Sequence, residues 1–258
     1  MSTVHATALV DTATELADSV SIGPYSVIGP GVQIGAGTRI GAHCVIEGPT
    51  RIGCDNVIHS HAALGGAPQD MKYRGEPTEL HIGDRNTIFQ FTTFSRGTVQ
   101  GGGVTRVGDD NWIMAYVHLA HDVQLGSHTV LANNATLAGH VHVGDWAIVG
   151  GLTGIHQFCK VGAHSFLANN VAITRDVPPY LLVAGTPAEP KGVNSEGLKR
   201  RGFSPEQIAN IRNAYRLLYR SGLKLAAATE QLQALAADQP ELLPFVQFLA
   251  ASERSIVR

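Results

Sequence analysis

The sequence predicts an all-β fold, a parallel β-helix shaped as a triangular prism, followed by a C-terminal α-helical domain. The first observation is a period of six, because an aliphatic residue recurs at every sixth position along most of the chain. The second is the glycine that often follows this residue, as in IGP, IGAG and VGD. The third is that the period ends before the last part of the chain, where helical patterning begins.

Two uninterrupted series of aliphatic residues carry the repeat, from Val4 to Leu64 and from Val107 to Ile173. Each hexad is predicted to supply a short strand and a turn, with one aliphatic side chain directed into a narrow interior. Three hexads then close one coil of 18 residues, and stacked coils share a hydrogen-bond ladder at a spacing of about 4.8 Å. We expect Gly or Asn at the corners, because these residues tolerate positive φ.

The repeat is interrupted twice by predicted external loops. From Leu64 to Ile82 the count of 18 keeps phase, but Asp70 and Glu76 occupy the intervening sixth positions. This predicts a loop near residues 65–80 that replaces part of the wall. A second loop, near residues 95–106, adds seven residues and contains three consecutive glycines. Loops that leave a rigid scaffold commonly carry function.

The predicted domains are a β-helix over residues 1–187 and a helical domain over residues 188–258. Pro178 and Pro179 are expected to end the strand ladder. Ser204 and Pro205 then predict the start of a helix that ends at Gly222. Residues 224–238 and 240–254 predict two further helices, and together the helices would cover the open end of the prism.

Composition and charge exclude several functional classes. The net charge of −2 predicts no nucleic-acid partner. Three cysteines without C-x-x-C spacing fit a reducing cytoplasm and argue against a disulfide framework or a zinc–cysteine site. The N-terminal residues lack the pattern of a signal peptide. No apolar run approaches the roughly 20 residues needed to span a bilayer, so no stable membrane insertion is expected.

A cluster of histidines supplies the candidate chemistry. An offset of 18 places Gly139 over His121 and His140 over Asp122 on the adjacent coil. A histidine base beside a backbone N–H suits acyl transfer, although Gly139 could equally be a corner residue. Asp122 could pair with His121, if a corner lies between them, or with His140. Two other histidines, His118 and His156, are expected to face outward beside the cluster. Three more, His43, His128 and His164, are scattered along the prism and are expected to be structural.

Motifs across nearly the whole chain resemble one family. The segments AHD, ANNATLAGHV, HQFCKVGAH, DVPPY, GLKRRGFS, QDMKYRGEPT and RGTVQGGG are similar to those of the acyl-carrier-protein-dependent UDP-N-acetylglucosamine O-acyltransferases of lipid A biosynthesis. The resemblance implies a left-handed prism, a homotrimer with active sites between neighbours, and a cytoplasmic enzyme. The implied reaction is the first step of lipid A biosynthesis. It moves an (R)-3-hydroxyacyl chain from the phosphopantetheine thioester of acyl carrier protein to the glucosamine 3-hydroxyl, with no other cofactor and no metal.

The same resemblance assigns roles to individual residues. His121 would be the general base, Asp122 would orient it, and the Gly139 N–H would stabilise the oxyanion. The residues that would bind the sugar nucleotide are Asp70, Lys72, His118, His140, His156, Gln157, Asn194, Glu196, Arg200 and Arg201. An arginine beside a phosphate is chemically sensible because its planar donors match phosphate oxygens. Without the family, the Arg200–Arg201 pair could equally be a solvated charge cluster.

Two departures and one charge pattern complete the prediction. Ser95 stands where the family commonly has a histidine, so that strand is assigned no catalytic role. Asn169 falls at the position that resembles the family's acyl-chain ruler, and its intermediate size predicts a chain of about 10 to 12 carbons, since unmatched polar atoms are costly beside hydrocarbon. Three arginines repeat every four residues along one helix face and could dock the acidic carrier protein or form a solvated face: Arg212, Arg216 and Arg220.

Three other functions fit parts of the sequence. A zinc enzyme of the gamma carbonic anhydrase type could use His118, His121 and His140 as ligands. The related N-acyltransferase, which acts one stage later, usually carries a domain before the hexads, whereas here the hexads begin at Val4. A non-enzymatic solenoid would need neither the stacked histidines nor the arginine-rich helix.

Overall fold

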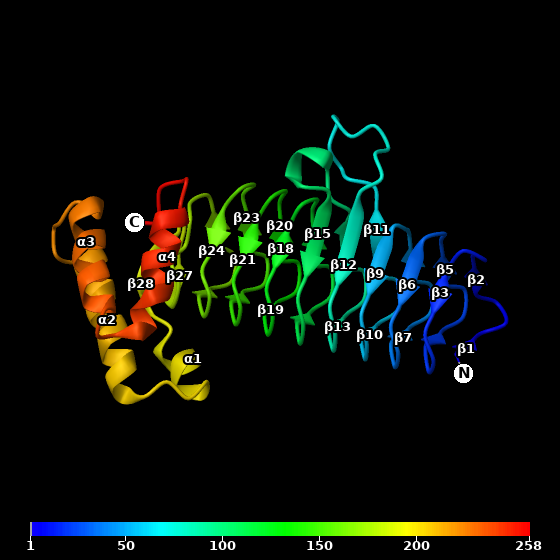
Figure 1. Cartoon of the computed structure of the whole chain (residues 1–258), viewed down its shortest axis with the longest axis horizontal. Coiled ribbons are helices and arrows are strands. Elements are labelled where there is room, and N and C mark those ends of the chain that lie inside the picture. The colour runs from blue at the N-terminus through cyan, green and yellow to red at the C-terminus, as the bar shows by residue number, and fades with distance from the viewer. Residues whose placement is uncertain (1) are drawn as a thin grey trace.

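A long prism of three parallel sheets forms most of the molecule, and helices close its C-terminal end (Figure 1). The structure, a computed structural model, describes residues 2–258. Successive strands pass from sheet A to sheet B to sheet C, so each coil adds one strand to each sheet. The prediction of three parallel sheets of hexapeptide repeats with a C-terminal helical region is confirmed. Its left hand stays an expectation from the resemblance.

The strands are short because each hexad must also make a corner. Sheet A has 11 strands: β1 (Thr3–Val4), β4 (Ser21–Ile22), β7 (Arg39–Ile40), β10 (Val57–Ile58), β13 (Thr87–Ile88), β16 (Trp112–Ile113), β19 (Val130–Leu131), β22 (Ile148–Val149), β25 (Phe166–Leu167), β27 (Leu181–Ala184) and β28 (Glu189–Val193). Sheet B has 9: β2 (Leu9–Val10), β5 (Val27–Ile28), β8 (Val45–Ile46), β11 (Ala63–Gly66), β14 (Thr93–Ser95), β17 (His118–Leu119), β20 (Thr136–Leu137), β23 (Gly154–Ile155) and β26 (Ala172–Ile173). Sheet C has 8: β3 (Glu15–Leu16), β6 (Val32–Ile34), β9 (Thr50–Ile52), β12 (Glu79–Ile82), β15 (Val104–Val107), β18 (Gln124–Leu125), β21 (His142–Val143) and β24 (Lys160–Val161).

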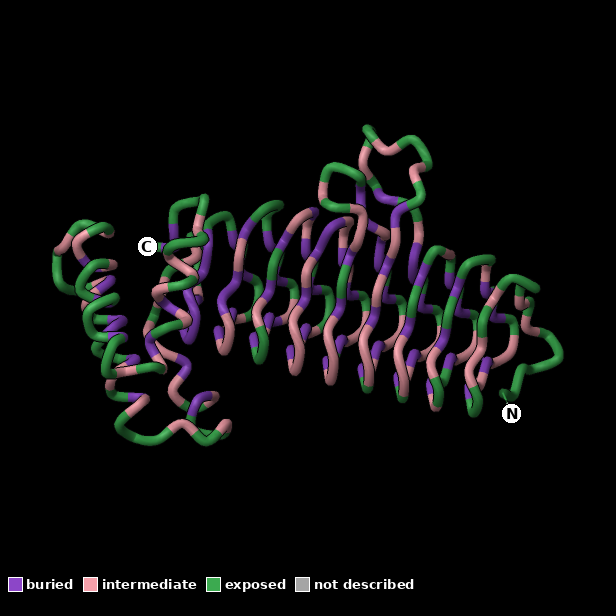
Figure 2. The backbone as a smooth tube through the Cα atoms, in the orientation of Figure 1, coloured by how far each residue is buried: buried purple, intermediate pink, exposed green. Residues whose placement is uncertain are grey.

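The aliphatic residue of each hexad fills the interior of the prism. Ile28 and Leu119 are 1% and 0% exposed, and Figure 2 shows buried and exposed residues alternating along the coils. Leu119 pairs with Leu137 on the next coil, which confirms the offset of 18. Val4 is 42% exposed, because the first coil has a neighbour on one side only. Each fully buried aliphatic side chain contributes about 1.5–3 kcal/mol, so stacking of coils supplies the stability.

The corners follow the expectation of Gly or Asn with positive φ only in part, at Gly31, Gly37, Asn134 and Asn170. Gly23 follows an inward residue, and a Cβ there would lie 2.7 Å from the carbonyl carbon of Gly41 on the next coil. These glycines therefore permit close approach of the coils. Positive φ belongs to the third residue after the inward one, where non-glycine side chains are common, as at His43 (57°) and Asp122 (61°). Stacking between successive coils lets large side chains occupy this unfavourable conformation.

Both external loops leave the prism at one edge, which we call the B–C edge because it joins sheets B and C. The first loop connects β11 to β12, and the second connects β14 to β15 through a short 3-10 helix, η1 (Val99–Gly101). Residues bonded between successive coils are normally offset by 18. Across the first loop the offset rises to 30, between Asn56 and Asn86, and across the second to 25, between Asn86 and Asn111. The first loop is therefore an insertion at one corner and does not replace wall.

The end of the prism differs from the prediction that Pro178 and Pro179 stop the ladder. Tyr180 has a φ of 68° and turns the chain, so that β27 continues sheet A in parallel with β25. The antiparallel strand β28 then closes this sheet. The prediction is wrong for sheet A, because the prolines lie in a corner where the ladder needs few donors. The boundary expected between residues 187 and 188 falls in the β27–β28 turn.

The C-terminal helices are α1 (Ser195–Arg200), α2 (Pro205–Tyr219), α3 (Leu225–Ala236), the 3-10 helix η2 (Pro240–Leu242) and α4 (Leu243–Ala251). Ser204 caps α2 in a capping box with Gln207, as its sequence predicts. Helix α1 was not anticipated. The Tyr180 hydroxyl donates to the Glu241 carbonyl at 3.0 Å and ties the helices to the prism. Every helix among residues 2–258 falls short of the length and apolar character that a bilayer crossing requires.

Candidate active site

The candidate catalytic residues lie on the B–C edge, at the level of the coils that follow the two loops. The His140 N–H donates to the His121 carbonyl at 3.0 Å, and the Phe158 N–H donates to the Gly139 carbonyl at 3.0 Å. These bonds place three successive coils in register, so that one column of the edge contains His121, Gly139 and Gln157. The neighbouring column contains Asp122, His140 and Phe158.

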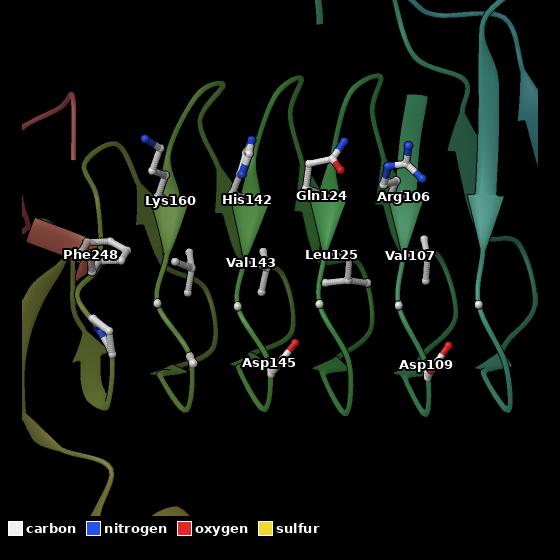
Figure 3. A pocket seen from close by; sticks show the side chains of 18 of the residues that line it. Arg106, Val107, Asp109, Gln124, Leu125, His142, Val143, Asp145, Lys160 and Phe248 are labelled. Carbon is white, nitrogen blue, oxygen red and sulfur yellow. The ribbon is translucent and has the colours of Figure 1, made fainter. Parts of the chain in front are cut away.

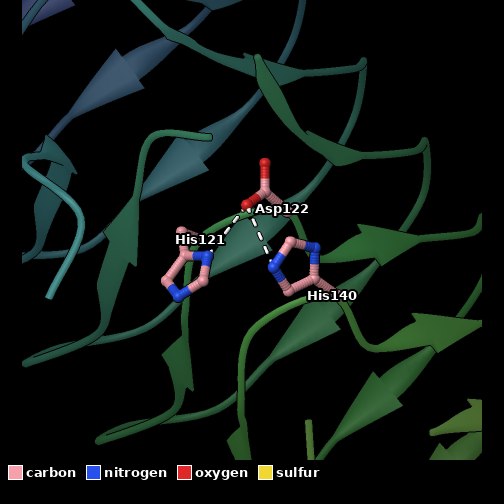
Figure 4. A group of neighbouring side chains, drawn as sticks. All are labelled: His121, Asp122 and His140. Atoms are coloured by element: carbon pink, nitrogen blue, oxygen red, sulfur yellow. Dashed lines mark hydrogen bonds and ion pairs between the residues drawn. The ribbon is translucent and has the colours of Figure 1, made fainter. Parts of the chain in front are cut away.

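His121 and Asp122 form a hydrogen-bonded pair (Figure 4). His121 Nδ1 lies 2.8 Å from Asp122 Oδ2, whereas His140 Nε2 lies 3.6 Å from the same oxygen. The positive φ of Asp122 turns the chain between the two residues, which lets adjacent side chains meet. A carboxylate only accepts hydrogen bonds, so Nδ1 carries the proton and Nε2 presents its lone pair. Nε2 has no hydrogen-bond partner among residues 2–258.

Gly139 lies directly against the His121 ring. A Cβ at residue 139 would be 2.5 Å from His121 Cε1 and 2.8 Å from Nε2, so any other residue would displace the imidazole. Its backbone N–H donates to no group of residues 2–258. The glycine thus leaves both the reactive nitrogen of the ring and one amide donor available on the same edge.

His118 and His140, which flank the His121–Asp122 pair, are partly buried. His118 Nδ1 lies 2.7 Å from Thr93 Oγ1, and burial lowers the pKa of His118. Burial also lowers the pKa of His140, although the charge of Asp122 opposes this shift. The His140 ring stands edge-on to His121 and stacks on Phe158 at 4.4 Å. Both imidazoles are therefore neutral at pH 7 and offer hydrogen bonds without adding charge.

His156 and Gln157 extend this edge toward the C-terminus, and both are exposed. His156 Nδ1 lies 3.1 Å from the Gln157 carbonyl oxygen and 3.5 Å from Arg254 Nη1. The Arg254 guanidinium also lies over the Phe158 ring at 6.0 Å. The C-terminal segment thus returns to the edge that carries the histidines.

Asp70 and Lys72 lie on the first loop. The Lys72 N–H donates to Asp70 Oδ1 at 2.9 Å, and the negative charge of Asp70 acts to raise the pKa of His140. Arg96 fastens this loop: Nη1 donates to the Gly65 carbonyl at 2.7 Å and Nη2 to the Tyr73 hydroxyl at 3.3 Å. The loop therefore projects from the B–C edge close to the histidine cluster.

The residues expected to bind the nucleotide lie elsewhere in the chain. Asn194 caps α1 by accepting from the Gly197 N–H at 3.2 Å, and it also donates to the His164 carbonyl at 2.9 Å. The Arg201 guanidinium lies over the Trp146 ring at 5.3 Å, on the edge between sheets C and A. Glu196 and Arg200 are exposed on α1. The chain alone does not bring these four residues to the His121 edge.

Asn169 and the α2 arginines are also separate from His121 in the chain. Asn169 is exposed near the edge between sheets A and B, and its Oδ1 accepts from the Gly151 N–H at 2.9 Å. Arg212, Arg216 and Arg220 are exposed on α2 or at its end. None of the three lies within 4 Å of a carboxylate of residues 2–258. Their charges are therefore available to a partner.

A groove of about 840 Å³ crosses the face of sheet C, between the B–C edge and the edge that joins sheets C and A (Figure 3). Polar side chains along it include Arg106, Gln124, His142 and Lys160. They recur once per coil at the same place in the repeat, so the period itself could have revealed this row. Sequence reasoning missed this row and Thr93, because outward polar residues on a repeat look like solvated surface. It also missed Thr98, because that residue lies in an inserted loop outside the period.

The B–C edge also contains a group of side chains that could bind a metal ion. One ligand atom from each of His121, Asp122 and His140 lies within 4.8 Å of the others. This set contains Asp122 in place of His118, so it differs from the three histidines considered for zinc. Asp122 Oδ2 already accepts from Thr98 Oγ1 and pairs with His121. These bonds suit a fixed histidine–carboxylate pair better than an open ligand set.

The prism of hexapeptide repeats indicates a class, the bacterial hexapeptide transferases. Matches to the model of six hexapeptide repeats cover residues 13–48 and 105–139. Residues 176–257 match the model described as domain 2 of UDP-N-acetylglucosamine O-acyltransferase. Because full-length relatives match at more than half identity, the chain belongs to the family of acyl-[acyl-carrier-protein]–UDP-N-acetylglucosamine O-acyltransferases.

Individual relatives support this assignment. The Thiobacillus denitrificans enzyme of this family is 56% identical over 258 residues, and the Herminiimonas arsenicoxydans enzyme is 53% identical over 262, each match covering 100% of both chains. The crystal structure of the Francisella novicida UDP-N-acetylglucosamine acyltransferase superimposes with a TM-score of 0.97 at 42% identity. That match covers 99% of this chain and 94% of the other.

Proposed function

We propose that this chain transfers an (R)-3-hydroxyacyl group from acyl carrier protein to the glucosamine 3-hydroxyl of UDP-N-acetylglucosamine, the first step of lipid A biosynthesis. The observation that carries the proposal is the His121–Asp122 pair at 2.8 Å, with the free Nε2 beside Gly139. A histidine held in this tautomer is a suitable base for a hydroxyl proton at neutral pH.

The proton moves through His121 in both halves of the reaction. Nε2 takes the proton of the sugar 3-hydroxyl while that oxygen attacks the thioester carbonyl carbon. The imidazolium that forms is stabilised by Asp122, as in other histidine–carboxylate pairs. When the tetrahedral intermediate collapses, the C–S bond breaks and Nε2 returns the proton to the leaving pantetheine thiolate. The products are the 3-O-acyl sugar nucleotide and carrier protein with a free thiol.

Gly139 is assigned to the charge that develops on the carbonyl oxygen. Its N–H has no partner among residues 2–258, so it can donate to an oxyanion without breaking an existing bond. A fixed donor of this kind typically contributes about 10²–10³ in rate. His118 and His140 are assigned to the sugar, together with Asp70 and Lys72 of the first loop.

The proposed active enzyme is a homotrimer. The nucleotide residues on α1 (Asn194, Glu196, Arg200 and Arg201) and the chain-length residue Asn169 lie away from the His121 edge of their own chain. A neighbouring copy could bring its α1 or its Asn169 to that edge. An assembly with active sites between chains would then unite the catalytic, nucleotide and chain-length residues. His156 and Gln157 would then contact the acceptor from the His121 side.

The donor is proposed to dock on α2 and to deliver a medium acyl chain. Carrier proteins are acidic, and the exposed Arg212, Arg216 and Arg220 offer positive charge without a carboxylate partner among residues 2–258. Asn169 is proposed to limit the chain to about 10 to 12 carbons, because its polar atoms disfavour contact with a longer hydrocarbon. Use of acyl carrier protein places the reaction in the cytoplasm.

The test is mass spectrometry of products from UDP-N-acetylglucosamine and (R)-3-hydroxyacyl carrier proteins of several chain lengths. Wild type is expected to give one acylated sugar nucleotide, and His121→Ala is expected to lose about 10²–10⁴ in rate. Dialysis against a chelator should leave turnover unchanged. Absence of product with every donor would refute the proposal, and turnover that returned only with added zinc would favour a metal enzyme at His121, Asp122 and His140.

A further inference from the structure

The second loop covers the carboxylate of Asp122. The Asp122 side chain is 1% exposed, although it belongs to an edge of the prism where corner residues are commonly open to solvent. The Cα of Gly101 lies against this carboxylate so closely that a Cβ at residue 101 would overlap it. An ionised group buried in this way must be hydrogen-bonded, because leaving it unpaired would be costly.

Thr98 supplies those hydrogen bonds with two different donors. Its backbone N–H donates to Asp122 Oδ1 at 2.8 Å, and its hydroxyl donates to Oδ2 at 2.6 Å. These two hydrogen bonds, one to each oxygen, fix the rotation of the carboxylate. Oδ2 is also the oxygen that His121 Nδ1 contacts at 2.8 Å. Thr98 and His121 therefore act on the same oxygen from the loop and from the prism.

The direction of the Thr98 hydroxyl is set by the loop itself. Its oxygen accepts from the Gly101 N–H at 3.3 Å as the cap of η1. A hydroxyl has one proton to give, and a carboxylate only accepts, so the proton of Thr98 goes to Asp122. Strand β15, which follows the loop, adds a further contact, since Thr105 Oγ1 accepts from the Asp122 N–H at 2.8 Å.

Backbone hydrogen bonds join the second loop to the prism, so the position of Thr98 relative to Asp122 is fixed. The Gly97 N–H donates to the Glu79 carbonyl at 3.1 Å, and the Glu79 N–H donates to the Gly103 carbonyl at 2.8 Å. These bonds hold both ends of the loop to β12. Residues on rigid elements position a catalytic group more accurately than those on free loops.

We propose that Thr98 is a positioning residue, which fixes the Asp122 carboxylate and through it orients the His121 ring for proton transfer. This inference rests on the proposed function, because it assumes that His121 is the base. A misplacement of about 1 Å in a reacting group can cost about 10²-fold in rate. The effect of Thr98 is therefore expected in turnover, since no part of the site described above assigns it to substrate.

The experiment measures kcat and KM for both substrates in wild type, Thr98→Val and Thr98→Ser. Val keeps the backbone donor and loses the hydroxyl, so kcat is expected to fall at least about tenfold, the size of a lost hydrogen bond to a charged group, with KM values nearly unchanged. Ser keeps the hydroxyl and is expected to restore kcat. Val99→Ala in the same turn is the control, because Val99 is apolar and 59% exposed.

A double-mutant cycle separates positioning from general stability. If Thr98 acts through Asp122, Thr98→Val should cost almost nothing in an Asp122→Asn background. An equal loss in both backgrounds, or a kcat unchanged by Thr98→Val, would overturn the inference. If Thr98→Val does not fold, Gly101→Ala provides the second route, because its Cβ displaces the same carboxylate and should lower kcat. Full activity of His121→Ala would refute the base assignment itself, which distinguishes the two failures.

Discussion

Two edges of the prism have the same backbone and different side chains. The edge between sheets A and B carries a column of stacked rings through its N-terminal half, with centroids 4.9–5.1 Å apart: Tyr25, His43, His61, Phe91 and Tyr116. The B–C edge carries Asp122 and His140 at the corresponding positions. His43 and Asp122 have nearly equal φ angles of 57° and 61°. The corner conformation is therefore common to both edges and is not what makes a site.

The difference lies in what is inserted at each edge. Both external loops leave at the B–C edge, and one of them buries Asp122 and completes its set of three hydrogen-bond donors. At the A–B edge the histidines stack between other rings, and His43 stacks on Tyr25 and His61. A histidine becomes a candidate base here because a loop fixes its carboxylate partner.

Among substitutions that leave His121 itself in place, the largest effect is expected from Gly139→Ala. The new Cβ would lie 2.5 Å from His121 Cε1, so the ring must move away from its position. We expect kcat/KM to fall about 10²-fold, as for other small misplacements of a catalytic group. Gly154→Ala on the next coil is the matched control, since a Cβ there meets no atom within 4 Å. Equal activities of the two variants would contradict the assigned role of Gly139.

Charge reversal on α2 tests a region outside both edges. Arg212→Glu combined with Arg216→Glu should raise KM for the acyl carrier protein about tenfold at low salt, with a smaller difference at high salt because exposed charges are screened. KM for the sugar nucleotide should stay constant. An unchanged KM for the carrier protein would remove α2 as the docking surface.

Asn169→Gly is expected to change selectivity more than rate. Removing the side chain that accepts from the Gly151 N–H opens space, so the preferred acyl chain should lengthen by about two to four carbons, since each added CH₂ that finds apolar cover gains about 0.8 kcal/mol. Competition between carrier proteins of different chain length measures this. The chain-length assignment fails if the preference of the variant matches that of wild type.

The smallest effect is a pH dependence of stability on the edge between sheets C and A. Burial, assisted by Arg201, lowers the pKa of His164 to about 4. In the unfolded chain His164 binds a proton near pH 6.5, whereas in the folded chain it does so only near pH 4. The free energy of unfolding should therefore fall as the pH falls from about 6.5 to about 4. His164→Asn, which tolerates the φ of 61°, should show a shallower fall in Tm between these values. Parallel Tm curves would contradict the prediction.

The prism could be predicted from sequence because one residue type at one period decides it. Leu119 and Leu137 must face inward, and an offset of 18 then fixes the neighbours on the next coil wherever no loop is inserted. The continuation through β27 could not be predicted, because Tyr180 turns the chain after two prolines in a way that no local pattern marks.

The site was predicted only in part, for a related reason. Periodicity places Gly139 over His121, but it leaves open whether Asp122 faces His121 or His140. In the structure Asp122 pairs with His121, and both carboxylate oxygens accept from Thr98, which belongs to an insertion outside the period. The joining of two distant edges by a neighbouring chain, which we propose, is equally invisible to the repeat. Sequence periodicity describes the scaffold, and the inserted loops add contacts to the candidate site that the period does not predict.

The most direct test of this account is a matched pair of substitutions, His121→Asn and His43→Asn, assayed with UDP-N-acetylglucosamine and an (R)-3-hydroxyacyl carrier protein. Both remove an imidazole from a prism edge, and thermal unfolding would verify that each variant is folded. We expect product formation to fall about 10²–10⁴-fold for His121→Asn and to stay within about twofold of wild type for His43→Asn, since surface changes away from a site have small effects. Equal losses in the two variants, or full activity in His121→Asn, would contradict the claim that the B–C edge carries the chemistry.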